Sequence, residues 1–204
     1  HPRAGFDVSL PMNPSDAASR LITLLASLML VLQLLLVVQR MLITNIRLFA
    51  LQSVLLAAIA TVVAFAYEAW HVLAISGLTL IGKAGLLPWQ LTRLVRRIRI
   101  EQEIHPFVNM PASMLICGAL TLLAYVVARP FTSLTRLGSN TLAVALTLLL
   151  TGFFLMINRR KAITQVLALL TTENGVMLAA IALSTYGIPL VVEISIFLDL
   201  IVAV

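Results

Sequence analysis

The sequence has very little charge for its length. Asp, Glu, Lys and Arg make up only 11% of the 204 residues, whereas about 25% is usual in a soluble domain. Hydrophobic residues make up 61%, against roughly 45–50% in such a domain. A soluble protein with so few charged residues could not cover its surface, which excludes an ordinary soluble enzyme, a disordered chain and a disulfide scaffold. The excess of apolar side chains predicts an all-α, polytopic membrane protein whose helices face lipid.

Residues that bind metals and cofactors are equally scarce. The one cysteine, Cys117, lies within an apolar run, and the three histidines are scattered along the chain. A single cysteine forms no intrachain disulfide, and the sequence has no Cys pair, no His pair at ligand spacing and no Gly-rich phosphate loop. We therefore expect no haem, iron–sulfur cluster, metal or nucleotide in this chain. We interpret Cys117 as a small buried hydrophobic residue.

Apolar runs long enough to cross a membrane occur seven times. A helix needs roughly 20 residues to cross about 30 Å of hydrocarbon. The predicted spans are 21–39, 48–67, 70–92, 113–129, 141–157, 163–186 and 189–204. We expect a transmembrane helix bundle over residues 21–204, with residues 1–20 as an extracytoplasmic arm. Because the chain does not begin with Met and its last apolar run has no polar flank, we expect further residues at both ends.

Basic residues predict the orientation, because cytoplasmic loops are enriched in Lys and Arg. Nine basic residues flank or fill the connections 40–47, 93–112 and 158–162, and four lie on the other side of the predicted membrane. We therefore predict a multi-pass protein of the inner (cytoplasmic) membrane, with these three loops in the cytoplasm and the N-terminus outside. The net charge of +6 is then a topology signal rather than a sign of nucleic-acid binding. Loop 93–112 is interpreted as an anchor at the lipid headgroups, a docking surface for a cytoplasmic partner, or both.

Four ionisable residues lie inside the predicted spans, namely Lys83, Glu173, Glu193 and Asp199. Such a side chain costs about 2.5 kcal/mol or more at mid-membrane, so it has to be paired, hydrated or neutral. The helical rise places Lys83, Glu173 and Asp199 at similar depths, ~15–18 Å from a membrane boundary, and Glu193 in the outer third. A buried acid and a buried lysine approach each other in proton affinity. The shared depth therefore predicts a lateral proton relay.

Two further residues are expected to support this site. Asn174 follows Glu173 and is predicted to hydrogen-bond a neighbouring helix. Pro88 follows Lys83 by five residues and frees a backbone carbonyl near Ala84, which favours a bend or a water site. Each ionisable residue also has a structural interpretation, in which the charges only fix helix packing and no proton passes.

The same residues form a pattern that resembles hydrogenase-4 component E, a membrane subunit of formate hydrogenlyase-type, group 4 NiFe hydrogenases. The matching features are Gln52-Ser53, Lys83 with Leu86 and Pro88, Glu173-Asn174-Gly175, Val192-Glu193-Ile194 and Asp199. Residues 141–204 are also similar to the three-helix K subunit of respiratory complex I and the C subunit of Mrp-type antiporters. In that resemblance Arg159-Arg160-Lys161 is the short basic loop, and Glu173 takes the place of the central acid. Either Glu193 or Asp199 stands for the second acid of the K subunit.

The resemblance implies a non-catalytic subunit of a redox-driven, ion-translocating complex. Its NiFe and iron–sulfur centres would lie on partner subunits. The implied partners are antiporter-like and channel-type membrane subunits and a peripheral hydrogenase arm. Lys83, Glu173 and Asp199 would carry protons through the membrane, or sodium would be the translocated ion instead. Glu193 would be a contact in the outer third of the membrane. The alternatives are a structural scaffold of the same membrane arm and a subunit of an Mrp-type cation/proton antiporter. A free-standing transporter is disfavoured because we find no convincing internal repeat.

Overall fold

The structure is a computed structural model that describes residues 14–66, 76–77, 80–98, 107–131 and 139–183. Every regular element within these ranges is a helix, as the composition predicts. In chain order they are α1 (Pro14–Val38), α2 (Leu42–Ala66), the π-helix η1 (Leu80–Leu86), α4 (Leu87–Ile98), α5 (Met110–Ala128), the short 3-10 helix η2 (Arg129–Phe131), α6 (Ser139–Asn158) and α7 (Ala162–Leu183).

Five of these helical segments are long and apolar enough to cross a membrane. They are Ala17–Val38, Leu42–Ala66, Met110–Phe131, Asn140–Asn158 and Ala162–Leu183. They correspond to the first, second, fourth, fifth and sixth predicted spans. The third predicted span, 70–92, is described only in part, as residues 76–77, η1 and the first half of α4. The seventh predicted span, 189–204, lies outside the described residues. Within the described residues the structure therefore supports a helical bundle with five such segments rather than seven.

Several predicted boundaries differ from the structure. Helix α2 begins at Leu42, within the predicted loop 40–47, and α5 begins at Met110, within the predicted loop 93–112. Helix α1 begins at Pro14, so its first turns lie within residues 1–20 that the sequence predicts as an arm. Proline suits this place because its missing N–H would have no partner in the first turn. Helix α4 continues to Ile98, six residues past the predicted end of the third span and into predicted loop 93–112.

The extension of α4 follows from its apolar spacing. Leu87, Leu91 and Val95 recur every four residues, and all three are buried in one apolar cluster with residues of α1, α2 and α7. Residues at this spacing share one face of a helix. Arg93 and Arg97 lie on the exposed side, so these charges are helical rather than part of a loop.

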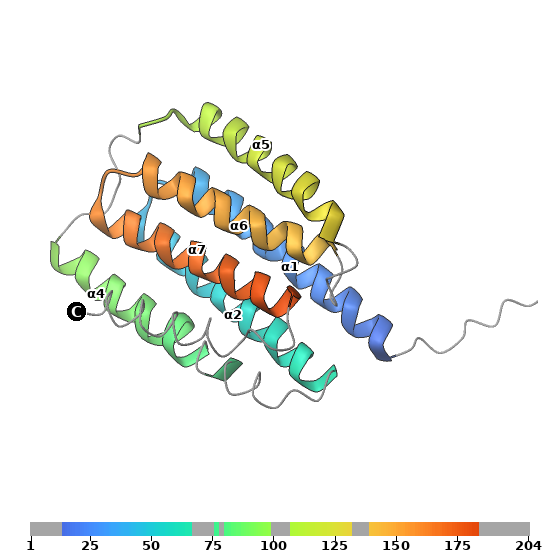
Figure 1. The fold of residues 1–204 in the computed structure, drawn as a ribbon. Helices are drawn as coiled ribbons and strands as arrows, with labels where there is room; N and C mark the ends of the chain where they lie inside the picture. Colours follow the sequence, from blue (N-terminus) through green and yellow to red (C-terminus); the bar gives the residue numbers. More distant parts are fainter. Residues whose placement is uncertain (1–13, 67–75, 78–79, 99–106, 132–138, 184–204) are drawn as a thin grey trace, which may run out of the picture.

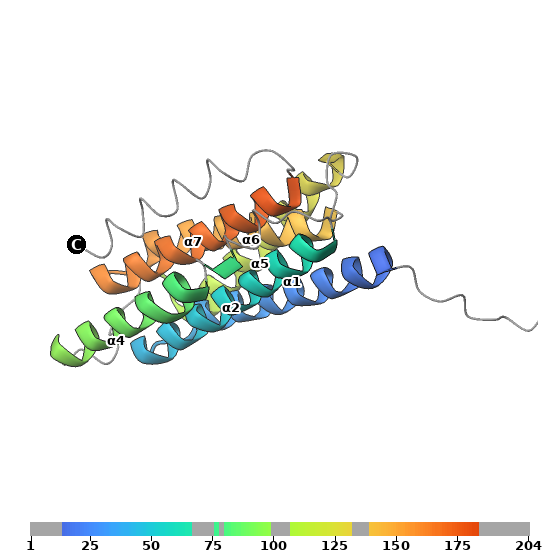
Figure 2. The ribbon, with the colours of Figure 1, turned by 90° about the horizontal axis from the view of Figure 1, so that it is seen from below.

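The helices lie side by side, with α1 and α2 in one layer and α6 and α7 in another (Figures 1 and 2). Helix α1 contacts α2, α5 and α6, and α2 contacts α7, η1 and α4. Helix α5 lies at one edge of the bundle and α4 at the opposite edge (Figure 1). Leu115 of α5 and Ile157 of α6 are each 76% exposed. Apolar side chains this exposed over helices of membrane-spanning length are suited to contact lipid.

Charge is distributed unevenly between the two ends of the bundle. We call the basic end the one where α1, α4 and α6 finish and α2, α5 and α7 begin (Figure 1). The described basic residues in or near these helix termini are Arg40, Arg47, Arg93, Arg96, Arg97, Arg159, Arg160 and Lys161. Only Arg20 and Arg129 belong to the opposite end among the described residues.

Helices α6 and α7 approach each other closely at two glycines. A Cβ added at Gly175 would lie 2.8 Å from the backbone nitrogen of Leu149 and 3.0 Å from the backbone oxygen of Ala145. A Cβ added at Gly152 would lie 3.1 Å from the Cα of Thr172. Small residues of this kind let helices pack closely in membranes. The contact fixes the part of α7 that carries Glu173.

We expect Gly175→Ala to destabilise the protein by about 1–3 kcal/mol, because the new methyl group meets backbone atoms that cannot rotate away. Thermal unfolding in detergent, followed by size-exclusion chromatography, measures the loss. Gly118→Ala on the exposed side of α5 is the matched control, since nothing lies within 4 Å of its added Cβ. Equal melting of both variants would contradict the close α6–α7 contact.

Candidate functional site

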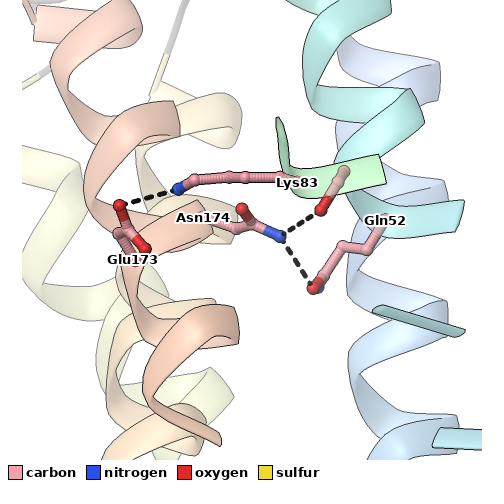
Figure 3. Close-up of polar contacts among 5 residues, drawn as sticks. Gln52, Lys83, Glu173 and Asn174 are labelled. Atoms are coloured by element: carbon pink, nitrogen blue, oxygen red, sulfur yellow. Dashed lines mark hydrogen bonds and ion pairs between the residues drawn. The ribbon is translucent and has the colours of Figure 1, made fainter. Parts of the chain in front are cut away.

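A buried ion pair joins the third predicted span to α7. The Nζ atom of Lys83 lies 2.8 Å from Oε1 of Glu173, and the two side chains are only 4% and 5% exposed. Figure 3 shows the lysine reaching across from η1 to the carboxylate on α7. The sequence predicts a common depth for these residues, and the structure brings them into direct contact.

The π-helix η1 positions the lysine. Its seven residues end at Leu86, and α4 begins at Leu87 with Pro88 as its second residue. Proline has no N–H to donate one turn back, but this loss is tolerated in the first turn of a helix. The sequence predicts a bend or a water site beside Lys83, and the structure places a wider π-turn immediately before α4. Single π-turns of this kind are frequent at functional sites.

Uncharged polar side chains extend the site toward α2 and α1. Asn174 donates through Nδ2 to Oγ of Ser53 at 3.2 Å and to Oε1 of Gln52 at 3.4 Å. Gln52 then donates through Nε2 to Oε1 of Gln33 at 3.1 Å. All four residues are fully buried. We call Gln33, Gln52, Ser53 and Asn174 the amide cluster; Figure 3 shows Asn174 reaching toward Gln52 beside the ion pair.

The amide cluster gives the predicted role of Asn174 a concrete form, because the residue does tie α7 to α2. It also leaves two buried atoms without a hydrogen-bond partner among the described residues, namely Nε2 of Gln33 and Oδ1 of Asn174. A buried polar atom in this state is energetically costly. The cluster therefore has capacity for further polar contacts.

A second buried cation lies at the basic end. Arg159 is 3% exposed, and its Nη2 donates to the backbone oxygens of Leu36 at 3.3 Å, Val37 at 3.0 Å and Gln39 at 3.0 Å. These carbonyls belong to the end of α1 and the residue beyond it, where the last carbonyls have no partner inside the helix. A cation is favourable there because the C-terminal end of a helix is partially negative. Arg159 therefore joins α1 to the α6–α7 connection.

The remaining predicted relay residues, Glu193 and Asp199, lie outside the described residues. Among the residues that the structure does describe, no three His, Cys, Asp or Glu side chains lie together as metal ligands would. Cys117 is buried in a small apolar cluster with Val37, Leu155 and Ala168, as its position in the sequence predicts.

Comparison with known proteins gives one informative relative. The chain is 33% identical to the uncharacterized protein Rv0085 of Mycobacterium tuberculosis (strain ATCC 25618 / H37Rv) over 161 residues. The aligned region covers 78% of this chain and 73% of that protein. The chain belongs to the Rv0085 family. No family model and no solved structure matches it.

Three buried polar residues of this Rv0085 family member, Gln33, Asn45 and Arg159, were not predicted from the sequence. Gln33 and Asn45 are uncharged polar residues in apolar helices, and a search for ionisable groups passes over them. Arg159 reads as a loop charge because Arg160 and Lys161 follow it. The signal that could have found the first two is one amide side chain inside a membrane-length apolar run, since such a group needs an interhelical partner.

Proposed function

We propose that this chain is an integral membrane subunit of a complex I-like, group 4 NiFe hydrogenase-type complex. In this role it contributes a mid-membrane relay to proton (or sodium) translocation, which is coupled to redox chemistry on other subunits. The observation that carries the proposal is the buried contact between Lys83 and Glu173. A paired lysine and carboxylate within the hydrocarbon depth mark ion and proton pathways in membrane proteins.

The relay chemistry needs only two protonation states of this pair. When the proton lies on Lys83, both groups are charged and attract each other across 2.8 Å. When it moves to Glu173, both groups are neutral, and no charge remains at the site. A change of charge in a neighbouring subunit shifts the balance between these states. Glu193 and Asp199 would extend the relay, with Asn174 and Pro88 supporting its geometry.

The resemblance to hydrogenase-4 component E supports the choice of complex. Lys83, Glu173 and Asn174 are among the residues that carry that resemblance, and they meet in one buried site. The excess of arginines at the basic end supports a cytoplasmic location for that end. The peripheral hydrogenase arm, with its NiFe and iron–sulfur centres, would then lie on the side of the membrane that the basic end faces.

A scaffold role is the second candidate, and the amide cluster favours it. The hydrogen bonds of Gln33, Gln52 and Asn174 tie three helices together without any titratable group. In that case the ion pair fixes helix packing and subunit order, and no proton passes through it.

Affinity purification of the tagged chain in mild detergent tests the proposed complex. We expect antiporter-like membrane subunits and a hydrogenase catalytic subunit to co-purify in fixed stoichiometry, together with hydrogen-dependent reduction of an artificial electron acceptor. A preparation made from cells that express the tag alone is the control. Recovery of this chain with cation/proton antiporter subunits and no iron–sulfur protein would overturn the hydrogenase assignment.

A further inference from the structure

A small polar cavity lies inside the bundle near the basic end. It has room of about 10 Å³, and its polar lining comes from Asn45, Arg159, Thr164 and Thr171. These residues belong to α2, α7 and the connection between α6 and α7. A cavity needs roughly 10–15 Å³ and two to four polar partners to hold one water molecule. The volume lies at the lower limit of this range, and four of the eight lining residues are polar; the other four are Leu36, Leu155, Leu167 and Ala168.

Asn45 presents an acceptor that nothing else in the described structure uses. The residue is 3% exposed, and its Nδ2 donates to the backbone oxygen of Gln39 at 3.2 Å. Its Oδ1 is buried and has no hydrogen-bond partner among the described residues. Buried side-chain oxygens are nearly always hydrogen-bonded, to protein or to an ordered water. A water molecule in the cavity would supply the missing donor.

The threonines complete the coordination of such a water. Thr164 donates its hydroxyl proton to the backbone oxygen of Lys161, and Thr171 donates its own to the backbone oxygen of Ala168, both at 2.8 Å. A hydroxyl oxygen that donates its proton can still accept a hydrogen bond. Oδ1 of Asn45 and Oγ1 of Thr171 therefore offer acceptors to the two protons of a water.

We propose that this cavity is a binding site for one neutral water molecule that completes the hydrogen bonding of Asn45, and that Arg159 beside it excludes cations. The water links α2 to α7, while Arg159 holds the end of α1 by its three carbonyl contacts. A buried guanidinium raises the energy of a second positive charge at the same place, because Coulomb repulsion is weakly screened there. Hydronium and sodium ions are therefore disfavoured, and water is not.

The position of the site has a consequence that rests on the proposed function. Fully buried Phe49 lies on α2 between Asn45 and Gln52, which are seven residues apart and share a helix face. An apolar ring therefore lies on α2 between the water site and the amide cluster. If the Lys83–Glu173 pair conducts protons, this face of α2 gives it no continuous polar route to the basic end, and exchange would run sideways to neighbouring subunits.

Electron cryomicroscopy of the purified complex tests the site, at a resolution where internal waters are visible elsewhere. We expect one density peak within hydrogen-bond distance of Oδ1 of Asn45. The peak should be lost in Asn45→Leu and kept in Asn45→Asp, which retains side-chain oxygens and controls for folding. An empty cavity in the wild-type protein, or a peak that persists in Asn45→Leu, would overturn the proposal.

A second data set with thallium(I), a monovalent cation of high scattering power, tests the exclusion of cations. We expect the peak beside Asn45 to keep the height of a water. A strong thallium peak would overturn the neutral-water assignment. Neither measurement depends on proton translocation. The two proposals can therefore fail separately. If a water is found at Asn45 while Glu173 variants remain fully coupled, the water site is supported and the proposed relay is contradicted.

Discussion

Replacing Lys83 with Met is expected to destabilise the protein by about 3–5 kcal/mol, because it leaves the Glu173 carboxylate buried beside an apolar chain. The pair is 2.8 Å apart and both side chains are about 95% enclosed, with 4% and 5% exposed. Loss of folded material on heating in detergent, read by size-exclusion chromatography, measures the effect. Arg97→Met on the exposed side of α4 is the matched control, with an expected change within about 0.5 kcal/mol.

The double variant Lys83→Met/Glu173→Met is expected to recover most of this loss. Replacing both members of a buried pair with apolar residues of similar volume removes two desolvation penalties together, and it is often neutral or stabilising. The wild type, Lys83→Met, Glu173→Met and the double variant form a double-mutant cycle, which isolates the interaction of the two side chains. If Lys83→Met were no less stable than Arg97→Met, the ion pair would contribute nothing to the fold.

The double variant also separates the two candidate functions. A scaffold needs the two helices to stay together, so recovered stability would bring back both assembly and coupling. A relay needs a group that takes up a proton, and Met has none, so assembly would return without coupling. A blue-native gel of the membranes reports assembly, and acidification of inverted vesicles reports coupling.

The sequence predicts the helices well because their signal is local. Apolar runs of membrane length mark α1, α2, α5, α6 and α7, and the depth of Lys83 and Glu173 follows from helical rise alone. Their direct contact joins the third and sixth predicted spans and is a tertiary fact that helical rise alone does not predict. The amide beside Glu173 also signals an interhelical bond, since an amide inside the hydrocarbon needs a partner.

The features that the sequence does not predict depend on residues that are distant in the chain but close in the fold. Arg159 looks like a loop charge, and only the end of α1, more than 110 residues earlier, explains its burial. The partners of Asn174 are likewise 122 and 121 residues away. These long-range contacts leave no local pattern. The helical state of Arg93 is different, because the apolar stripe of Leu87, Leu91 and Val95 recurs every four residues and could have been found in the sequence.

Glu173→Gln is expected to uncouple the complex while leaving its redox activity within about twofold of the wild type. The amide oxygen of Gln still accepts a hydrogen bond from Lys83, and the side chain has nearly the same shape. It cannot take up a proton, so a relay through this position loses roughly tenfold or more of its rate. Hydrogen-driven acidification of inverted vesicles, divided by the hydrogenase rate of the same vesicles, measures the coupling ratio.

Thr172→Val is the matched control for this substitution. It changes the neighbouring residue, keeps the volume, and removes a hydroxyl whose bond goes to the backbone oxygen of Ala168 on the same helix. We expect it to keep the wild-type coupling ratio. Glu173→Asp should retain part of the ratio, because it keeps a titratable group but sets it back by one methylene. Full coupling in Glu173→Gln would remove this carboxylate from any conduction path. The scaffold role, which the amide cluster favours, would then be the better explanation of the site.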